Sequence, residues 1–338
     1  MIKSGIEAQI NAVKEYASFF DDTLVDSNVP LSCIIYDPYA YFLCTTPEAK
    51  ELVVNSVKAL NNALPTLFEH PIVRNKLQAT GLSHVTSADD LIKVFETSSP
   101  SYPWNFMACY FTGTPSTADK IFLRTKYIDD VVMENQKTIK QIVVIGAGMD
   151  MRALRLEFDQ EITVFEVDTP QVIEYKTNML TKTISKHITP RSKAKNCHVS
   201  ADLRFAEQWT KQLVASGYDP TKPSFWLAEG LLMYLSEDEI DVLLKTVSSM
   251  SAPGSKILIQ TVEPIPPATT PEMKMLYMMS APIGEFRSFT TTPNLYLDRA
   301  GFGSDIVLKN YLHLVELYGA PKQNGTSSAF TIGTKPSL

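Results

Sequence analysis

Two glycines separated by one residue follow an apolar, β-branched run in this sequence. Residues 143–150 read VVIGAGMD, with Gly146 and Gly148 directly after the run. A glycine at the end of a strand permits a tight turn into a helix, and a second glycine lets the backbone approach a ligand closely. A dinucleotide site would have a third glycine at position 151, where this chain has Met151. The pattern therefore predicts a site for a nucleotide-like ligand and argues against cradling of a pyrophosphate.

An acidic residue ends the next apolar run, where a carboxylate can bind a ribose. Asp168 closes residues 162–168 and lies 20 residues beyond Gly148. This is the spacing at which an acid accepts hydrogen bonds from two ribose hydroxyls. Glu166, two residues earlier on the same face of the strand, is the competing candidate. The simpler alternative is that one of the two acids only caps the helix predicted to follow.

Two more acids follow two more apolar runs. Asp202 comes after the third run and Glu229 after the fourth. Ligands of an open parallel sheet bind outside the carboxyl ends of its strands, so both acids should face the crevice that holds Gly146 and Asp168. For Asp202 the alternative is a helix cap. Burial of Glu229 within the apolar residues 225–235 would be costly without a partner, which favours a functional role.

These residues need a framework of alternating strands and helices. Short apolar runs predict buried parallel strands, and the amphipathic segments between them predict helices. The expected strands are residues 139–146, 162–168, 194–203, 223–230 and 256–263, and the expected helices are residues 150–156, 170–185, 205–217 and 236–250. Ser236 is the expected N-cap of the last helix, with Glu239 at the capping-box position. Two closing strands, 304–312 and 328–334, with no long helix between them predict an antiparallel hairpin. The fold class is therefore α/β, a Rossmann-like doubly wound sheet that is mostly parallel.

The N-terminal third of the chain has a different character. Residues 1–123 contain amphipathic segments, for example 6–20 and 89–96, joined by proline-containing loops. They predict a helical cap or lid, followed by a ligand-binding sheet domain over residues 124–338. Within that domain, residues 263–294 hold six prolines and four methionines. Methionine adapts to varied apolar ligands, so this insertion is a candidate substrate lid, with core packing as the simpler interpretation.

Composition narrows the function classes. The 338 residues are 44% hydrophobic and 20% charged, the mixture of a globular protein. The net charge of −6 argues against a nucleic-acid partner, since phosphates need a basic face, but it suits a cationic ligand. The four cysteines form no CxxC pair, which favours a reducing compartment and no zinc site. No apolar stretch reaches the roughly 20 residues of a membrane span, and residues 1–20 lack a signal-peptide run. We expect a soluble, cytoplasmic protein without a membrane partner or metal.

Five motifs in order resemble the leucine carboxyl methyltransferase family, most of all its bacterial-type branch of small-molecule O-methyltransferases. The resemblance is carried by LRTKYIDD from residue 123, VVIGAGMDMRALRL from residue 143, VFEVDTPQVIEYK from residue 164, SADLR from residue 200 and FWLAEGLLMYLSEDEIDVLL from residue 225. YDPYAYFL from residue 36 is similar to a motif of the family's helical cap. The match is dense from residue 124 to residue 260 and looser elsewhere.

The resemblance implies a class I methyltransferase that uses S-adenosyl-L-methionine. It implies that Arg124 pairs with the carboxylate of this cofactor and that Glu229 lies beside the cofactor's methionine end. For Arg124 the alternative is a structural ion pair with Asp129 or Asp130, which follow it in the same segment.

The resemblance also implies the remaining cofactor contacts. They are Gly146, Ala147 and Gly148 for the methionine moiety, Asp168 for the ribose, and Asp202 and Leu203 for the adenine. Met151 departs from the threonine or serine often found at its position, which removes one polar contact.

Methyl transfer to a carboxylate needs little acid–base chemistry from the protein. A free carboxyl group has a pKa near ~4, so it is ionised at pH 7 and requires no general base. None of the five histidines lies in a motif, and catalysis would depend on positioning. Tyr234 is a candidate catalytic residue that hydrogen-bonds the acceptor, with a half-buried aromatic at a helix start as the alternative. We expect an O-methyltransferase acting on a carboxylate of a small molecule or peptide. Gly230 and Leu231 differ from the pair in the protein-phosphatase enzyme, which argues against a phosphatase tail as acceptor.

Other functions remain as alternatives. A phenolic or nitrogen acceptor would need a base, for which the motifs offer no candidate. A nicotinamide oxidoreductase would share the fold, but Met151 counts against it. A non-catalytic protein with a cofactor-binding fold would bind the cofactor without turnover. The charge of −6 makes a tRNA modifier the weakest alternative.

Overall fold

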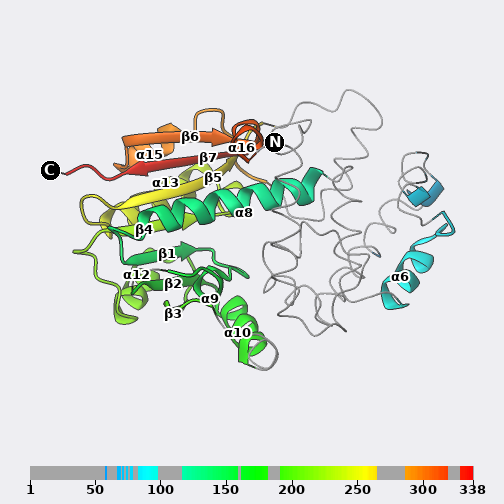
Figure 1. Ribbon diagram of the computed structural model, residues 1–338, viewed down its shortest axis with the longest axis horizontal. Coiled ribbons are helices and arrows are strands. Elements are labelled where there is room, and N and C mark those ends of the chain that lie inside the picture. Colours follow the sequence, from blue (N-terminus) through cyan, green and yellow to red (C-terminus); the bar gives the residue numbers. More distant parts are fainter. Residues whose placement is uncertain are drawn as a thin grey trace. The chain divides into compact units, whose positions relative to one another are not determined.

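The computed structural model describes residues 58, 67–69, 71, 74, 77–78, 83–97, 116–158, 161–181, 191–264, 286–318 and 328–337 (Figure 1). The chain divides into two compact units. One comprises Met1–Phe122 with Pro266–Glu285, and the other comprises Leu123–Ile265 with Phe286–Leu338. We call the second the sheet unit, because it contains every strand that the structure describes.

In the first unit, the predicted helix over residues 89–96 is confirmed as α6, Ala88–Thr97. Its first turn is capped locally, since the Ser87 hydroxyl accepts a hydrogen bond from the Asp90 amide at 3.1 Å. A single 3-10 turn, η1, spans Leu67–Glu69. The predicted helix over residues 6–20, the motif from residue 36 and most of the 263–294 insertion lie outside the described residues. The cap and lid therefore stay predictions.

The sheet unit is built on seven strands in the order β3-β2-β1-β4-β5-β7-β6. The strands are β1 Gln141–Ile145, β2 Thr163–Asp168, β3 Lys195–Ser200, β4 Ser224–Ala228, β5 Lys256–Val262, β6 Ser304–Asn310 and β7 Ser328–Thr334. The first five run parallel, and β7 is antiparallel to both of its neighbours. All five strands predicted for the parallel part are confirmed. The order reverses between β1 and β4, which is where an open parallel sheet binds its ligand.

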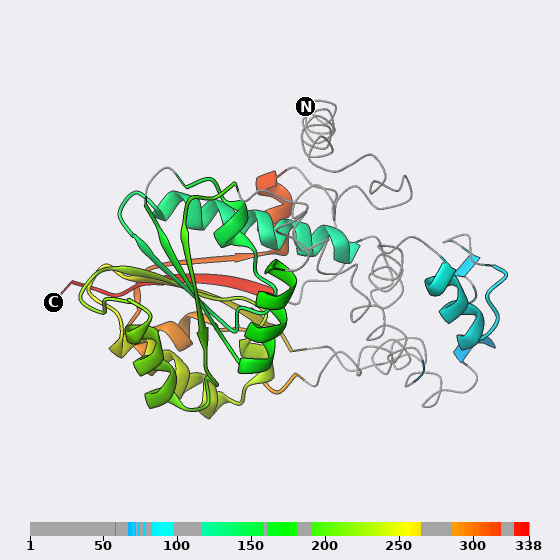
Figure 2. The same cartoon turned by 90° about the horizontal axis from the view of Figure 1, so that it is seen from below.

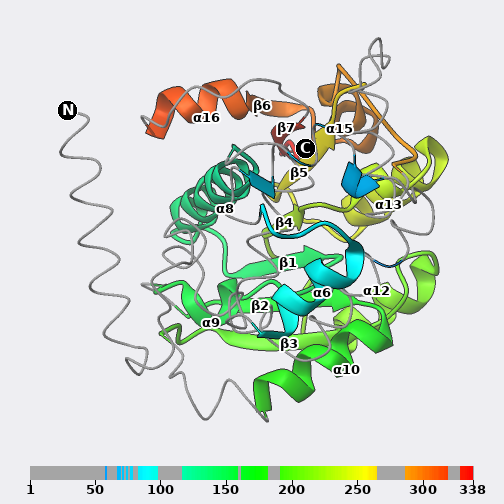
Figure 3. The same cartoon turned by 90° about the vertical axis from the view of Figure 1, so that its right-hand side faces the viewer.

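Helices cover both faces of the sheet. Their bounds are α8 Ser116–Asn135, α9 Arg152–Arg155, α10 Pro170–Met179, α12 Ala206–Ala215, η3 Leu232–Tyr234, α13 Glu237–Ser249, α15 Asn294–Ala300 and α16 Tyr311–Tyr318. Figure 3 shows α8, α9 and α16 on one side of the sheet and α12, α13 and α15 on the other, and Figure 2 shows α8 and α13 separated by the strands. The predicted capping box of α13 is confirmed, because the Glu239 amide donates to Ser236 and the Ser236 amide donates to the Glu239 carboxylate.

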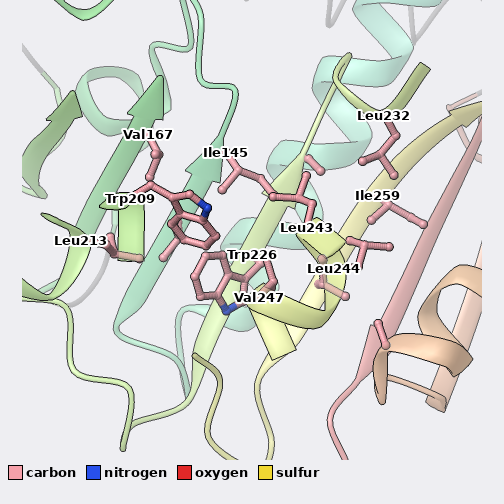
Figure 4. Packing of buried hydrophobic residues seen from close by; sticks show 14 of the residues in the cluster. Ile145, Val167, Trp209, Leu213, Trp226, Leu232, Leu243, Leu244, Val247 and Ile259 are labelled. Carbon is pink, nitrogen blue, oxygen red and sulfur yellow. The ribbon is translucent and has the colours of Figure 1, made fainter. Parts of the chain in front are cut away.

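The α12–α13 face buries the larger aromatic core. Trp226 on β4 is fully buried and makes an edge-to-face contact with Trp209 (Figure 4). It makes a second edge-to-face contact with Tyr218. Every residue of β1 and β4 is buried, which explains why both strands read as continuous apolar runs rather than alternating ones. These two central strands form the rigid base from which the ligand-binding loops emerge.

The closing strands form the antiparallel pair that was predicted, but a helix separates them. The sequence predicts a strand over residues 304–312, whereas β6 ends at Asn310 and α16 starts at Tyr311. The side-chain oxygen of Asn310 accepts a hydrogen bond from the His313 amide at 3.2 Å, so Asn310 caps α16. Tyr311 and Leu312, which the sequence assigns to the strand, are therefore the first residues of α16.

We expect Gly333→Ala to destabilise the sheet unit by about 3 kcal/mol or more. A Cβ at Gly333 would lie 2.2 Å from the Phe302 carbonyl oxygen and 2.9 Å from a Leu297 methyl. The matched control is Gly254→Ala, because Gly254 has a φ of +79° with no atom near its missing Cβ. This control should cost only the ~1–2 kcal/mol of backbone strain. Urea unfolding followed by circular dichroism measures both, and equal midpoints for the two variants would contradict the prediction.

Alkaline pH should unfold the sheet unit because four of its described tyrosines, Tyr127, Tyr218, Tyr296 and Tyr311, are buried. Burial raises the pKa of Tyr127, Tyr218 and Tyr311 to about 12. Folding therefore favours the neutral phenols: this stabilisation is complete below pH ~10 and is lost as the pH rises through about 12. Circular dichroism between pH 9 and pH 12.5 should show this loss, and Tyr218→Phe should reduce it. A wild-type stability that stays constant across this window would refute the prediction.

Candidate functional site

The glycine loop after β1 is anchored on the neighbouring strand. The amides of Gly146 and Ala147 donate to the Val167 carbonyl at 2.9 and 3.1 Å. Gly146 has a φ of +65°, and a Cβ there would come within 3.0 Å of a Leu231 methyl. Gly148 has a φ of +48° and faces open space, with no atom within 4 Å of its missing Cβ. The loop thus exposes bare backbone at Gly148, where a ligand can approach closely.

Asp168, and not Glu166, faces this loop. One carboxylate oxygen of Asp168 accepts a hydrogen bond from the Gly148 amide at 2.7 Å, and the other accepts from the Thr169 amide at 2.7 Å. Glu166 is fully buried and forms an ion pair with Lys176 at 2.5 Å. Its carboxylate is therefore already satisfied inside the protein, and Asp168 is the acid that stays accessible to a ligand.

A cavity of about 570 Å³ opens outside the carboxyl ends of β1, β2 and β3. Its polar wall includes Asp168 and Asp202, and its apolar wall includes Leu203, Leu231 and Leu235. Gly146 and residues of α13 also line the cavity. The volume is within the range of about 300–1,000 Å³ that is typical of small-molecule sites.

Asp202 does not cap a helix. Its carboxylate accepts hydrogen bonds from the backbone amide and the guanidinium of Arg204 at 2.9 and 3.0 Å. These bonds hold the pKa of the Asp202 carboxyl below its usual range. The following helix, α12, has Phe205 at its N-cap without a side-chain bond. The carboxylate is thus an ionised acceptor at the rim of the cavity.

Arg124 and Glu229 form a second group of predicted residues. The Arg124 Nε lies 2.6 Å from the Glu229 Oε1, and both side chains are half-buried. The alternative that Arg124 pairs with Asp129 or Asp130 is wrong: Asp129 binds two other arginines, and Asp130 binds Lys126 and Tyr318. The sequence predicted the two members of this ion pair separately, without linking them.

The predicted site residues therefore form two neighbouring groups rather than one crevice. Gly146, Asp168, Asp202 and Leu203 line the cavity. Arg124 and Glu229 lie in a buried charged cluster with Asp150, which ends the glycine loop. Two short segments contribute to both groups. In the first, Gly146 lines the cavity and Asp150 lies in the cluster; in the second, Glu229 lies in the cluster and Leu231 lines the cavity.

Tyr234 lies at the end of η3 and is 38% exposed. Its ring packs edge-to-face on Phe286 with centroids 5.3 Å apart. Among the described residues, no hydrogen bond involves its hydroxyl, so that group is open to a ligand or to solvent. Its predicted contact with the acceptor stays a prediction.

Several residues of the site were not predicted from the sequence. Arg152 is buried and forms ion pairs with three carboxylates, and Lys176 donates to the Asp150 carbonyl at the end of the glycine loop. A signal existed, because MDMRALRL places Asp150, Arg152 and Arg155 in a segment that must pack on a buried strand. Charges in such a segment need partners, which we could have sought among the other acids.

The arrangement suits an uncharged planar ring, a ribose and an amino acid more than a metal. Carboxylates accept hydroxyl and amine hydrogen bonds, and the leucines offer apolar contact.

No cluster of metal-ligating side chains occurs in the described part of the chain. Of the three histidines within the described ranges, His198 bonds Thr177 and Asn196, His313 bonds Asn310, and His84 is exposed. No helix in those ranges is long and apolar enough to cross a membrane.

Comparison with known proteins places the chain in a family. The family model described as leucine carboxyl methyltransferase matches residues 25–248. The chain belongs to the leucine carboxyl methyltransferase family. This match confirms the family resemblance. The strand order confirms the α/β fold with the mostly parallel sheet that is expected of a class I methyltransferase.

Relatives in the family carry names that mention the expected cofactor. A candidate S-adenosyl-L-methionine-dependent methyltransferase of Mycolicibacterium smegmatis is 41% identical over 153 residues, 45% of this chain and 46% of that relative. A second one from the same organism is 31% identical over 223 residues, 65% of this chain and 69% of that relative. For most of the first relatives, the match spans about half of their length. The cofactor expectation is thus confirmed for the family.

Solved structures with a similar fold include a candidate methyltransferase from Thermobifida fusca. It is 17% identical, with a TM-score of 0.47, and the match covers 71% of this chain and 90% of that one.

Proposed function

We propose that this protein transfers the methyl group of S-adenosyl-L-methionine to a carboxylate of a small molecule or peptide. One observation carries the proposal: Gly146 of the glycine loop, Asp168 and Asp202 line one cavity of about 570 Å³ at the point where the strand order reverses. Membership of the leucine carboxyl methyltransferase family supports it independently.

The cavity residues fit the nucleoside part of the cofactor. Asp168 would accept hydrogen bonds from the ribose hydroxyls, since its oxygens lie beside the exposed backbone of Gly148. Asp202 would accept from the amino group of adenine, and Leu203 and Leu231 would contact the faces of the ring. A planar apolar ring with one polar edge matches a wall of leucines beside one carboxylate.

The charged cluster fits the amino-acid part of the cofactor. The Nε of Arg124 forms an ion pair with Glu229 without a well-aligned hydrogen bond, and among the described residues no other ion pair involves Arg124. Its two terminal NH₂ groups are therefore available to a ligand carboxylate in the two-point geometry that arginine favours. Glu229 would accept from the ligand's ammonium group beside it, with the loop of Gly146, Ala147 and Gly148 lining the chain between.

The bound cofactor would supply an electrophilic methyl group on a sulfonium, and the protein would bind and orient both partners. The acidic residues of the site favour a cation over a neutral ligand. A carboxylate acceptor is ionised at pH 7, so the described site needs no histidine or other base. Positioning can lower such a barrier by roughly 7–11 kcal/mol. Tyr234, which precedes the cavity-lining Leu235 in the chain, would hydrogen-bond the acceptor.

Two experiments test the two halves of the proposal. Calorimetry should show that the wild-type protein binds S-adenosyl-L-methionine and S-adenosylhomocysteine, and failure to bind either would refute the cofactor half. Incubation with labelled S-adenosyl-L-methionine and a cell extract should yield a product that releases methanol in base. A base-stable methyl group would instead indicate a phenolic or nitrogen acceptor, and binding without any turnover would indicate a non-catalytic protein.

A further inference from the structure

One arginine next to the glycine loop contacts three carboxylates. The Nε of Arg152 lies 2.8 Å from Asp129, its Nη1 lies 2.8 Å from Glu229, and the same Nη1 pairs with Asp150. Its backbone amide also donates to the Asp150 carboxylate at 2.8 Å. The side chain is only 7% exposed, so these acids replace water as its partners.

The three acids come from three segments that each carry a proposed cofactor residue. Asp129 lies on α8, one to two turns after Arg124. Asp150 ends the loop that contains Gly148, and Glu229 follows β4. A single guanidinium group therefore ties together the segments that would hold the amino-acid end of the cofactor.

Glu229 is held from both sides. Its Oε1 pairs with Arg124 at 2.6 Å, and its Oε2 pairs with Arg152 at 2.8 Å. The carboxylate thus bridges the half-buried Arg124, which would face the ligand, and the buried Arg152. Because each oxygen pairs with a different arginine, the two ion pairs restrict the orientation of the carboxylate and hold it beside the Nε of Arg124.

The cluster is electrically balanced. Arg124, Arg152 and Arg155 face Asp129, Asp150 and Glu229, so three positive charges meet three negative ones. Burial alone would raise the pKa of the Asp150 carboxyl, but Arg152, Lys176 and Arg155 outweigh this and hold it below its usual range. A zwitterionic ligand end can enter such a cluster without leaving a net buried charge, which would be costly.

We propose that Arg152 is a positioning residue that fixes Glu229, and through it Arg124, for the amino-acid end of the cofactor. The proposal rests on the proposed function. It assigns Arg152 to one part of the ligand only, because among the described residues its guanidinium forms no hydrogen bond or ion pair with the cavity residues that would hold the nucleoside.

The test compares two ligands that differ in this part alone. S-adenosylhomocysteine carries the amino-acid end, and 5′-methylthioadenosine has the same nucleoside and sulfur without it. Arg152→Lys keeps the charge but cannot bridge three carboxylates with one planar group. In calorimetry, we expect it to weaken S-adenosylhomocysteine binding by about tenfold or more and 5′-methylthioadenosine binding by less than about twofold.

Arg299→Lys is the control. Arg299 on α15 pairs with Asp241 at 2.8 Å, and in the described part of the chain no ion pair joins it to the charged cluster. The control should change the affinity ratio of the two ligands by less than about twofold. Equal weakening of both ligands by Arg152→Lys, or of neither, would overturn the proposal. Failure of the wild type to bind either ligand would instead refute the proposed function on which it rests.

A second variant keeps the proposal testable if Arg152→Lys does not fold. In Asp150→Asn, Arg152 keeps its bonds to Asp129 and Glu229 but loses one charged partner, so the affinity ratio of the two ligands should fall in the same direction and by less. Glu229→Gln supplies the coupling test, because Arg152→Lys should add little to its effect if Arg152 acts through Glu229. Additive effects on S-adenosylhomocysteine binding would contradict that route.

Discussion

Asp168→Ala should weaken S-adenosylhomocysteine binding by at least about a hundredfold. Two charge-assisted hydrogen bonds to a ribose are worth about 3–6 kcal/mol together, and each ~1.4 kcal/mol is a factor of ten in affinity. The same carboxylate also accepts the Gly148 amide at 2.7 Å, so its removal frees the loop that would approach the ligand. Calorimetry on the purified variant measures the loss directly.

The control for this prediction removes a carboxylate from the next helix. Glu174 is exposed on α10, and Glu174→Ala should leave the dissociation constant within about twofold of the wild-type value. Asp168→Asn should fall between the wild type and Asp168→Ala, because one oxygen acceptor remains. Binding by Asp168→Ala within about threefold of the wild type would show that another group holds the ribose.

The largest effect on stability is expected for Lys176→Met. Lys176 and Glu166 are both fully buried and paired at 2.5 Å, and removal of one partner from such a pair typically costs about 3–5 kcal/mol. The remaining neighbours of the Glu166 carboxylate are His198 and Asn196 at 3.3 Å, which cannot replace a full charge at that distance. Urea unfolding followed by circular dichroism should show the loss as a lower midpoint.

The double variant Lys176→Met/Glu166→Leu tests whether the stability lost in Lys176→Met comes from the unpaired Glu166 charge or from altered packing. Because no unpaired charge remains, it should recover most of the stability lost in the single variant. Lys211→Met is the control, since Lys211 pairs with Glu207 on the exposed face of α12 and such pairs contribute about 0–1 kcal/mol. A single variant as stable as the wild type, or a double variant less stable than Lys176→Met, would contradict the prediction.

Much of the sheet unit could be predicted from local sequence because its signals are local. β1 and β4 are buried along their whole length, so each appears as a short apolar run with a glycine or an acid after it. The α13 cap needs only Ser236 and Glu239, three residues apart. The position of Asp168 at the carboxyl end of β2 follows from the strand alone.

One local prediction was wrong and another was left open. The strand predicted over residues 304–312 ends at Asn310, and Tyr311 begins α16, which Asn310 caps. Glu166 and Asp168 lie two residues apart on one strand, and only the packing of Lys176 from α10 shows that Glu166 is occupied. In both cases the deciding hydrogen bond or ion pair depends on the backbone being folded first.

The sequence by itself determined the family, the alternation of strands and helices, and the acids that stand at the strand ends. It did so because hydrophobic periodicity and turn residues act over a few neighbouring positions. The tertiary structure alone decided that Glu229 bridges Arg124 and Arg152, and that Asp129 and Asp150 complete the cluster. These residues come from α8, the glycine loop, α9 and the end of β4. The charges of buried side chains must be neutralised by whatever partner the fold brings within about 3 Å, and no local pattern specifies that partner.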